Sequence, residues 1–140
     1  MESEDPYNIP QSLLHLELDE CELGDAGAYA IGQALMQSNK TKIRLKILSL
    51  KENAISDFGA ARIAKGLEYC RSLKSLNLSK NHINDSGGEL FAIALKYNDD
   101  LEELDLSYND FRWSTGAAFF EGLRYNRRLR ILNLESMIPA

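Results

Sequence analysis

The sequence predicts an α/β solenoid, in which strand–helix units repeat so that parallel strands line a concave face and helices line the convex face. Three observations lead to this fold class. A Leu-x-x-Leu-x-Leu pattern occurs five times, its last four copies begin 28 residues apart, and a helical run rich in small residues follows each of the first four copies. One such unit cannot bury its own apolar face, whereas stacked units share a continuous leucine core.

The leucine segments are expected to form short strands, because apolar and polar residues alternate along them. They begin at residues 13, 45, 73, 101 and 129. Strands that alternate with helices run parallel and are joined by right-handed crossovers, so we expect a curved, right-handed horseshoe segment. The first spacing is 32 residues, and the extra residues fall near "SNKTKIR" (38–44), which we interpret as a surface loop.

The repeat also predicts the domain organisation. Residues 1–12 form an N-terminal extension, and residues 13–140 form the repeat domain, with about four 28-residue repeats and a final strand. Helices are expected where two apolar columns, four residues apart, mark one helix face. They cover residues 26–37, 59–70, 87–98 and 115–126, and the columns are Ile31, Ile63, Phe91 and Phe119, then Leu35, Leu67, Leu95 and Leu123.

An asparagine follows the last leucine of three repeats by three residues, at Asn53, Asn81 and Asn109, and Cys21 takes this place in the first repeat. A side-chain amide can both donate and accept hydrogen bonds. We therefore predict that stacked asparagines tie each turn to its neighbour and serve the scaffold rather than catalysis.

The residues just before the helical runs predict helix caps. Asp25, Asp57 and Asp85 stand where a carboxylate can accept hydrogen bonds from the first N–H groups of a helix. Trp113 replaces this aspartate in the fourth repeat, so Ser114 or Thr115 is expected to cap there. We favour a Trp113 packed over a helix end, and an exposed Trp113 would be a second binding candidate.

Composition and charge restrict the class of protein. The chain is 44% hydrophobic, has no run of 18 apolar residues, and begins "MESEDPYNIP", which lacks the features of a signal peptide. We therefore expect a cytoplasmic protein that binds no membrane, with Cys21 and Cys70 as reduced, buried or half-buried thiols.

Residues 1–39 carry eight acidic and no basic side chains, whereas the rest carries 16 basic and 13 acidic ones. This balance disfavours nucleic-acid binding, and the acidic start serves either solubility or attraction to a basic partner.

No arrangement of residues in the sequence is typical of catalysis. His15 and His82 lie about two and a half repeats apart, and no known catalytic or phosphate-binding motif occurs. Glu102, Glu103 and Asp105 lie close in sequence, but alternation sends the two glutamates in different directions, so a solvated acidic patch is favoured over a cation site. We predict that the chain is not an enzyme and holds no cofactor and no metal ion.

Two full repeats, "LKILSLKENAISDFG" (45–59) and "LKSLNLSKNHINDSG" (73–87), resemble the ribonuclease-inhibitor class of leucine-rich repeats. The resemblance covers about residues 13–135, and it is weakened where Cys21 replaces asparagine and Trp113 replaces aspartate. The class includes ribonuclease inhibitor, Ran GTPase-activating protein, the sensor ends of NOD-like receptors, and ciliary repeat proteins. The resemblance implies a protein partner bound on the concave face or on the rim.

The candidate binding residues are the polar ones that alternate with the leucines, because these face away from the core. The face runs from acidic through mixed or basic to acidic, and Tyr108 is the one aromatic residue among these positions. The predicted partner-binding residues are Glu17, Asp19, Glu20, Lys51, Lys80, Asp105 and Tyr108, with Trp113 on the turn-side rim.

The sequence thus favours a non-enzymatic protein-interaction scaffold, cytosolic or associated with cytoskeletal or ciliary assemblies. The alternative is a regulator of an enzyme, either a GTPase-activating protein of the Ran type or an inhibitor of a basic enzyme. The last leucine segment (129–134) has no following helix, and Met137 occupies the next asparagine position. We expect the chain to be a shortened piece of a longer array, or its C-terminal edge to be covered by another molecule, which makes self-association through that edge possible.

Overall fold

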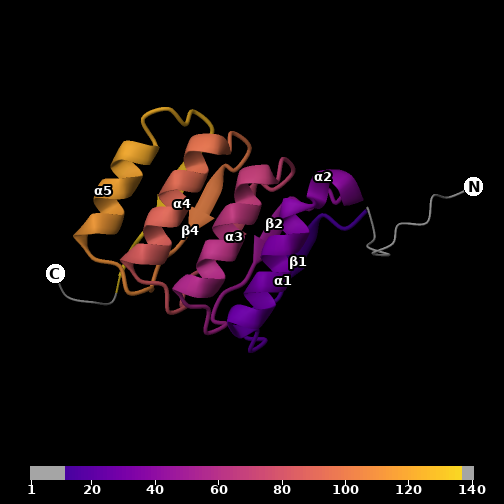
Figure 1. Cartoon of the computed structure of the whole chain (residues 1–140), viewed down its shortest axis with the longest axis horizontal. Helices are drawn as coiled ribbons and strands as arrows, with labels where there is room; N and C mark the ends of the chain where they lie inside the picture. Colours follow the sequence, from indigo (N-terminus) through magenta and orange to yellow (C-terminus); the bar gives the residue numbers. More distant parts are fainter. Residues whose placement is uncertain (1–11, 137–140) are drawn as a thin grey trace, which may run out of the picture.

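The computed structural model describes residues 12–136, so most of the predicted extension and the end that contains Met137 lie outside the described residues. Strands and helices alternate along the chain, and the five strands form one parallel sheet in sequence order (Figure 1). The elements are β1 (His15–Glu17), α1 (Gly24–Met36), α2 (Ser38–Thr41), β2 (Ile47–Ser49), α3 (Asp57–Tyr69), β3 (Ser75–Asn77), α4 (Asp85–Tyr97), β4 (Glu103–Asp105), α5 (Trp113–Gly122) and β5 (Ile131–Asn133).

The strand register follows the leucine pattern. The middle leucine of each strand pairs with its equivalent in the next strand, so that Leu16, Leu48, Leu76, Leu104 and Leu132 form one row across the sheet. The helices form a second layer along one side of the sheet (Figure 1). Packed helices need about 8–10 Å each, whereas paired strands need about 4.8 Å, so the helix layer takes the outer, convex side. The predicted α/β solenoid is confirmed.

The core is best buried in the middle repeats. Leu73 and Leu101 are fully buried, whereas Leu13, the equivalent residue of the first segment, is 38% exposed. Ile63 is also fully buried, while Ile31 in the same column of α1 is only half-buried. An end repeat has a neighbour on one side only, and its leucines therefore keep part of their solvent contact.

The first connection differs from the loop that we expected. Residues Ser38–Thr41 form the short helix α2, and it ends at Lys42, which adopts a left-handed conformation with φ 59°. The Ser38 hydroxyl donates a hydrogen bond to the Leu35 carbonyl, and the Ile43 N–H donates to the Ser38 carbonyl. The insertion is therefore an ordered turn of helix that directly follows α1.

The asparagine column behaves as predicted. Asn81 Oδ1 accepts hydrogen bonds from the N–H groups of Asn53 (2.9 Å) and Ile55 (3.0 Å) in the preceding turn. Its Nδ2 donates to the carbonyls of Leu50 (3.1 Å) and Leu78 (2.9 Å). Each amide thus joins two turns, and because the site is buried, no water replaces these bonds.

A second asparagine column, which the sequence reasoning missed, lies where the helices end. Asn98 is fully buried, and its Nδ2 donates to the carbonyls of Leu67 (2.7 Å) and Cys70 (3.1 Å) in the preceding repeat. Asn126 repeats the arrangement on Leu95. Both ends of α4 and of α5 are therefore fastened to the preceding repeat by polar side chains.

The aspartates cap helices, but not their own. Asp25 lies in the first turn of α1, and its Oδ1 accepts hydrogen bonds from the N–H groups of Ser56 (2.8 Å) and Gly59 (3.1 Å) at the start of α3. Asp57 accepts from Asn84 (2.8 Å) and Gly87 at the start of α4. The expectation that each aspartate caps the helix that follows it directly was wrong, because stacking brings the next helix start closer to the carboxylate.

The same correction applies to α5. Thr115 does not cap α5, because its hydroxyl and its N–H both donate to Asp85 of the preceding repeat. The Arg112 N–H also donates to Asp85, at 2.9 Å. Because Asp85 supplies the cap, the replacement of aspartate by Trp113 does not leave the start of α5 uncapped.

Candidate functional site

The predicted binding residues of the sheet lie at two levels along the strands. Alternation turns Glu17, Asp19, Lys51 and Asp105 away from the core, and Glu17 is exposed while the other three are half-buried. A second level lies just past each strand, where Glu20, Glu52, Lys80 and Tyr108 occupy equivalent repeat positions. All four have positive φ, between 54° and 57°. Such left-handed backbone is uncommon for residues other than glycine and costs about 1 kcal/mol each.

Lys80 and Tyr108 come together at the end of β3 and β4. The Lys80 ammonium lies 5.9 Å from the centroid of the Tyr108 ring, within range of a cation–π contact. Both residues are exposed, and Tyr108 keeps 37% of its surface. The backbone holds them in place, because the Lys80 N–H donates to the Ser107 carbonyl and the Tyr108 N–H donates to the Glu135 carbonyl. The pair therefore presents an aromatic ring and an ammonium group side by side on the strand face.

Two of the predicted acidic residues mainly shape the sheet. Asp19 Oδ1 accepts hydrogen bonds from the Ser49 hydroxyl (2.6 Å) and the Lys51 N–H (2.9 Å). Asp105 Oδ1 accepts from the hydroxyl and the N–H of Ser107. Their carboxylates are therefore partly occupied by the scaffold, whereas those of Glu17 and Glu20 project into solvent at the first repeat. Glu17 also lies 2.9 Å from His15 Nε2.

Apolar residues on the same face were not among the predicted ones. Ile47 begins β2 and is 38% exposed, and Ile131 begins β5 and is 55% exposed. The sequence could have indicated them, because the residue just before the middle leucine of each strand also points outward. The strand face therefore offers apolar contact area at its second and fifth strands in addition to charges.

Trp113 lies apart from the sheet face, at the first residue of α5, and it is 82% exposed. The expectation that it packs over a helix end was wrong. In earlier repeats the equivalent aspartate contacts the next helix, and α5 is the last helix of the described chain. An exposed tryptophan is a candidate binding anchor.

Phe120 lies seven residues after Trp113 on α5 and is 86% exposed. Earlier repeats have Gly32, Ala64 and Ala92 at this position, and all three are buried. A Cβ on Gly32 would clash with the carbonyl of Arg62 on the next helix, so this flank of each helix is the one that meets the following repeat. The sequence carried a signal here, because a phenylalanine interrupts a column of small residues.

Neither the cysteines nor the possible metal-binding side chains of the described residues form a reaction centre. Cys21 and Cys70 are both free, and Cys70 is buried, whereas Cys21 is exposed, contrary to the expectation for that residue. Among the described residues, no group of three or more His, Cys, Asp or Glu side chains could hold a metal ion. Within residues 12–136, no helix is long and apolar enough to span a lipid bilayer.

The shifted carboxyl groups belong to the helix caps. Burial raises the pKa of Asp25, but hydrogen bonds from the Ser56 hydroxyl and from the N–H groups of Ser56 and Gly59 outweigh it, so the pKa lies below its ordinary value. The pKa of Asp85 is lowered in the same way against burial, by the Thr115 hydroxyl, the Arg112 N–H, and further bonds from Ser114 and Thr115. These shifts report structural caps, because each carboxylate is directed at backbone N–H groups.

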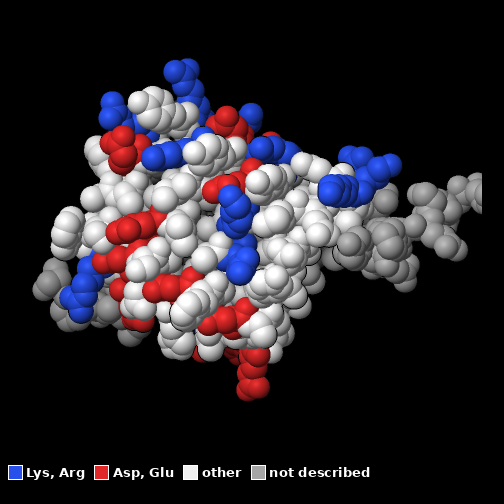
Figure 2. All heavy atoms as spheres, viewed as in Figure 1, with Lys and Arg blue, Asp and Glu red and all other residues white. Residues whose placement is uncertain are grey.

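Basic side chains also gather away from the sheet face. Figure 2 shows Lys and Arg around α2, at the end of the molecule where the insertion lies. The sequence carried a signal for this cluster as well, since Lys40, Lys42, Arg44 and Lys46 stand at every second position. The sequence reasoning treated this stretch only as an inserted loop.

Comparisons with known proteins agree with the repeat architecture. The pattern described as Leucine Rich repeat matches residues 10–32 and 69–92, and a second one described as Leucine Rich Repeat matches residues 100–123. A comparison with curated protein sequences gives no significant match.

Two solved structures share the fold. "Leiomodin-1 Actin-Binding Site 2 (ABS2)" has a TM-score of 0.78 and 21% identity, over 91% of this chain and 73% of that chain. The tropomodulin C-terminal domain of Caenorhabditis elegans has a TM-score of 0.77 and 14% identity, over 91% of this chain and 77% of that chain. The repeated leucine pattern, the one-layer parallel sheet with its outer helices, and the family patterns agree, and the chain belongs to the leucine-rich repeat family.

Proposed function

We propose that the chain is a non-enzymatic protein-binding module whose partner contacts the strand face around Lys80 and Tyr108. The observation that carries this proposal is that Lys80 and Tyr108 are both exposed at neighbouring positions of the strand face, with the Lys80 ammonium 5.9 Å from the centroid of the Tyr108 ring. Tyrosine is enriched among the residues that dominate binding energy. Ile47 and Ile131 supply exposed apolar area on the same face.

Actin is the first partner to test, in a cytoskeletal setting. The solved leiomodin-1 fragment that shares this fold is named as an actin-binding site. The proposal is that this chain also contacts actin, through the residues of its own strand face.

The test measures co-sedimentation with actin filaments and binding to labelled actin monomers. Lys80→Ala with Tyr108→Ala should weaken binding at least tenfold, which corresponds to about 1.4 kcal/mol. Lys96→Ala with Tyr97→Ala is the matched control, because it removes the same two residue types from the exposed surface of α4. Absence of binding by the unaltered chain would exclude actin, and equal binding by both variants would place the contact elsewhere.

The alternative, an inhibitor of a basic enzyme, is favoured by the first repeat. Glu17, Glu20 and Glu22 are all exposed there, and like charges that project together attract a basic surface. Glu17→Lys with Glu20→Lys would then slow association with a basic partner. Added salt would likewise slow the association of the unaltered chain with that partner.

The C-terminal end is proposed as a site of self-association. Trp113 and Phe120 share one exposed flank of α5, and β5 is the edge strand of the sheet. Arg124, Arg127, Arg128 and Arg130 make this end basic, whereas the opposite end carries both exposed glutamates and the basic residues around α2 (Figure 2). A contact between two copies through this end would cover the aromatic flank and the edge of β5.

A further inference from the structure

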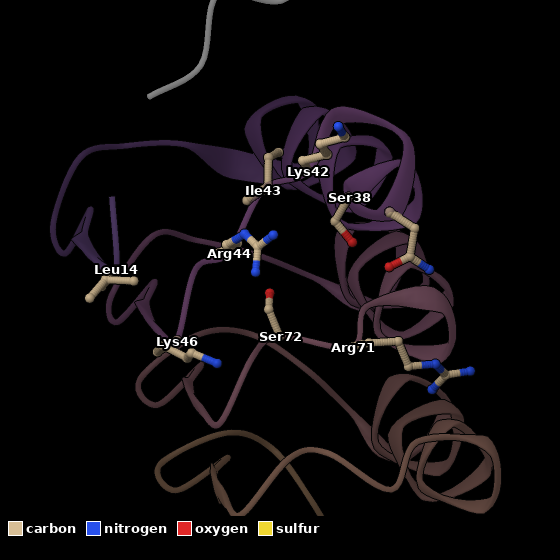
Figure 3. Close-up of a pocket in the computed structure, with 9 residues that line it drawn as sticks. Leu14, Ser38, Lys42, Ile43, Arg44, Lys46, Arg71 and Ser72 are labelled. Carbon is tan, nitrogen blue, oxygen red and sulfur yellow. The ribbon is translucent and has the colours of Figure 1, made fainter. Parts of the chain in front are cut away.

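A cavity of about 410 Å³ opens beside α2, at the rim where helices end and strands begin. Its walls come from α2, from the segment that follows α2, and from the turn after α3 (Figure 3). The polar side chains that matter to the argument are Ser38, Lys42, Arg44, Lys46, Arg71 and Ser72. None of them belongs to the strand face around Tyr108.

The four-residue insertion creates this cavity. Residues 42–46 alternate, with Lys42, Arg44 and Lys46 exposed while Ile43 is half-buried and Leu45 is buried. The N–H of Lys46 donates to the Leu14 carbonyl at 2.8 Å, which fixes the end of the segment against the residues before β1. The insertion therefore places three cations on one side of an anchored segment.

Within the described residues, few acidic groups stand against the charges of the cavity. Among residues 12–136, no ion pair within 4.0 Å involves Lys42, Arg44 or Lys46, and no Asp or Glu lines the cavity. Arg71 is the exception, because its Nη1 lies 3.7 Å from Asp100 Oδ2 and donates to the Tyr97 carbonyl. Three unpaired cations around a concave surface concentrate positive potential within it.

The side chains are arranged to donate hydrogen bonds into one space. In Figure 3 the Arg44 guanidinium and the Ser72 hydroxyl point toward one another, and Lys46 lies below them with its ammonium directed sideways. A guanidinium fork, an ammonium and a hydroxyl are complementary donors for an anion with several oxygens. A phosphate monoester, with two charges and three terminal oxygens, uses all three donors, whereas a carboxylate has only two oxygens.

We propose that this cavity binds a phosphate group carried by a phosphorylated side chain of a protein partner. The proposal rests on the proposed function only in that the phosphate is carried by a protein, since the cavity and the strand face use different residues. Arg44 and Lys46 neutralise the phosphate, Ser72 donates to a remaining oxygen, and Lys42 adds charge at the entrance.

The test follows the backbone amide signals of the full chain by NMR during titration with a five-residue peptide that contains one phosphoserine among glycine and alanine. The signals of Arg44, Lys46 and Ser72 should shift and saturate, and the unphosphorylated peptide should leave them in place. Arg44→Gln with Lys46→Gln should weaken binding of the phosphoserine peptide at least tenfold, while the remaining signals keep the native pattern.

The control variant is Arg62→Gln with Arg112→Gln, which removes the same charge from exposed side chains outside the cavity. Equal weakening by both variants would reveal general charge attraction and overturn the proposal. Absence of saturating shifts would also overturn it, and so would inorganic phosphate that binds as tightly as the peptide.

A further experiment measures binding of the chain to vesicles of phosphatidylcholine that contain a phosphoinositide. Vesicle binding that depends on Arg44 and Lys46, without any response to the peptide, would assign the cavity to a lipid headgroup instead. The actin assay with the Lys80 and Tyr108 variant is independent of all these outcomes, so failure here and failure of the proposed function can be told apart.

Discussion

At the scale of single residues, side-chain amides determine how one repeat is joined to the next. Asn81 serves two turns at once, and Asn98 does the same where helices end. Both residues are buried, so each satisfies backbone groups that water does not reach. Cys21 has no side-chain amide that could accept and donate in this way. The first turn is instead tied to the second by Asn53, whose Oδ1 accepts from the N–H groups of Cys21 and Leu23.

Replacement of Asn81 by alanine should lower the free energy of unfolding by about 1–3 kcal/mol, because it leaves buried N–H and carbonyl groups without partners. Urea unfolding followed by circular dichroism measures the effect. His82→Ala, at the exposed neighbouring position, is the control and should change little. An Asn81→Ala midpoint equal to that of the unaltered chain would contradict the stacking.

At the scale of elements, the starts of α3, α4 and α5 are each capped by a carboxylate from the preceding repeat. Asp25 joins α1 to α3, Asp57 joins α3 to α4, and Asp85 joins α4 to α5. A carboxylate near a helix start also interacts favourably with the helix dipole. Each cap is therefore a contact between repeats, and its loss should separate neighbouring units rather than shorten one helix.

Asp25→Asn should lower stability by about 0.3–1 kcal/mol at neutral pH, because it keeps an oxygen that accepts the N–H bonds but removes the negative charge at the start of α3. The pKa of Asp25 is lower in the folded chain than its ordinary value, so the unfolded chain binds the proton more readily. The stabilisation is thus complete above the ordinary pKa and is lost as pH falls through the folded-state pKa.

The measurement for this prediction is urea unfolding of both proteins between about pH 7 and pH 2, where the difference should shrink toward the acidic end. Glu22→Gln, at an exposed carboxylate nearby, serves as the control. A difference that stays constant across this range would argue that the charge of Asp25 contributes nothing.

At the scale of the whole molecule, the two ends of the solenoid differ in charge and in shape. The first repeat carries exposed glutamates and the exposed basic residues around α2, and the last carries arginines together with Trp113 and Phe120. The middle repeats are closed on both sides and hold the fully buried leucines. Association properties should therefore depend on the ends, and stability mainly on the middle.

Sedimentation across a concentration series should detect self-association of the chain. Trp113→Ser with Phe120→Lys should shift the molecule to a monomer, because the apolar flank of α5 is then removed. Phe58→Ser is a matched control, since Phe58 is also 82% exposed but lies on α3, away from the end. A monomer at every concentration before any substitution would refute the proposed contact, as would equal effects of both variants.

Much of the fold could be predicted because its cause is periodic. The 28-residue spacing places equivalent residues side by side, so strand order, leucine rows and the Asn81 ladder follow from counting. The strand-face residues were predicted for the same reason, and the structure brings Lys80 and Tyr108 together as neighbours in that pattern. Trp113 was predicted to pack over a helix end, and it is instead 82% exposed.

The sequence by itself determined the repeating unit, its parallel register and the residues that face outward, because these depend on spacing along one chain. The tertiary structure alone decided which helix each aspartate caps, since Asp25 and Gly59 become neighbours only when repeats stack. It also decided the exposure of Trp113 and Phe120, which depends on the absence of a further described helix beside α5. The basic cavity belongs to this second group, because Arg44 and Ser72 are separated along the chain and meet only through the packing of the first two repeats.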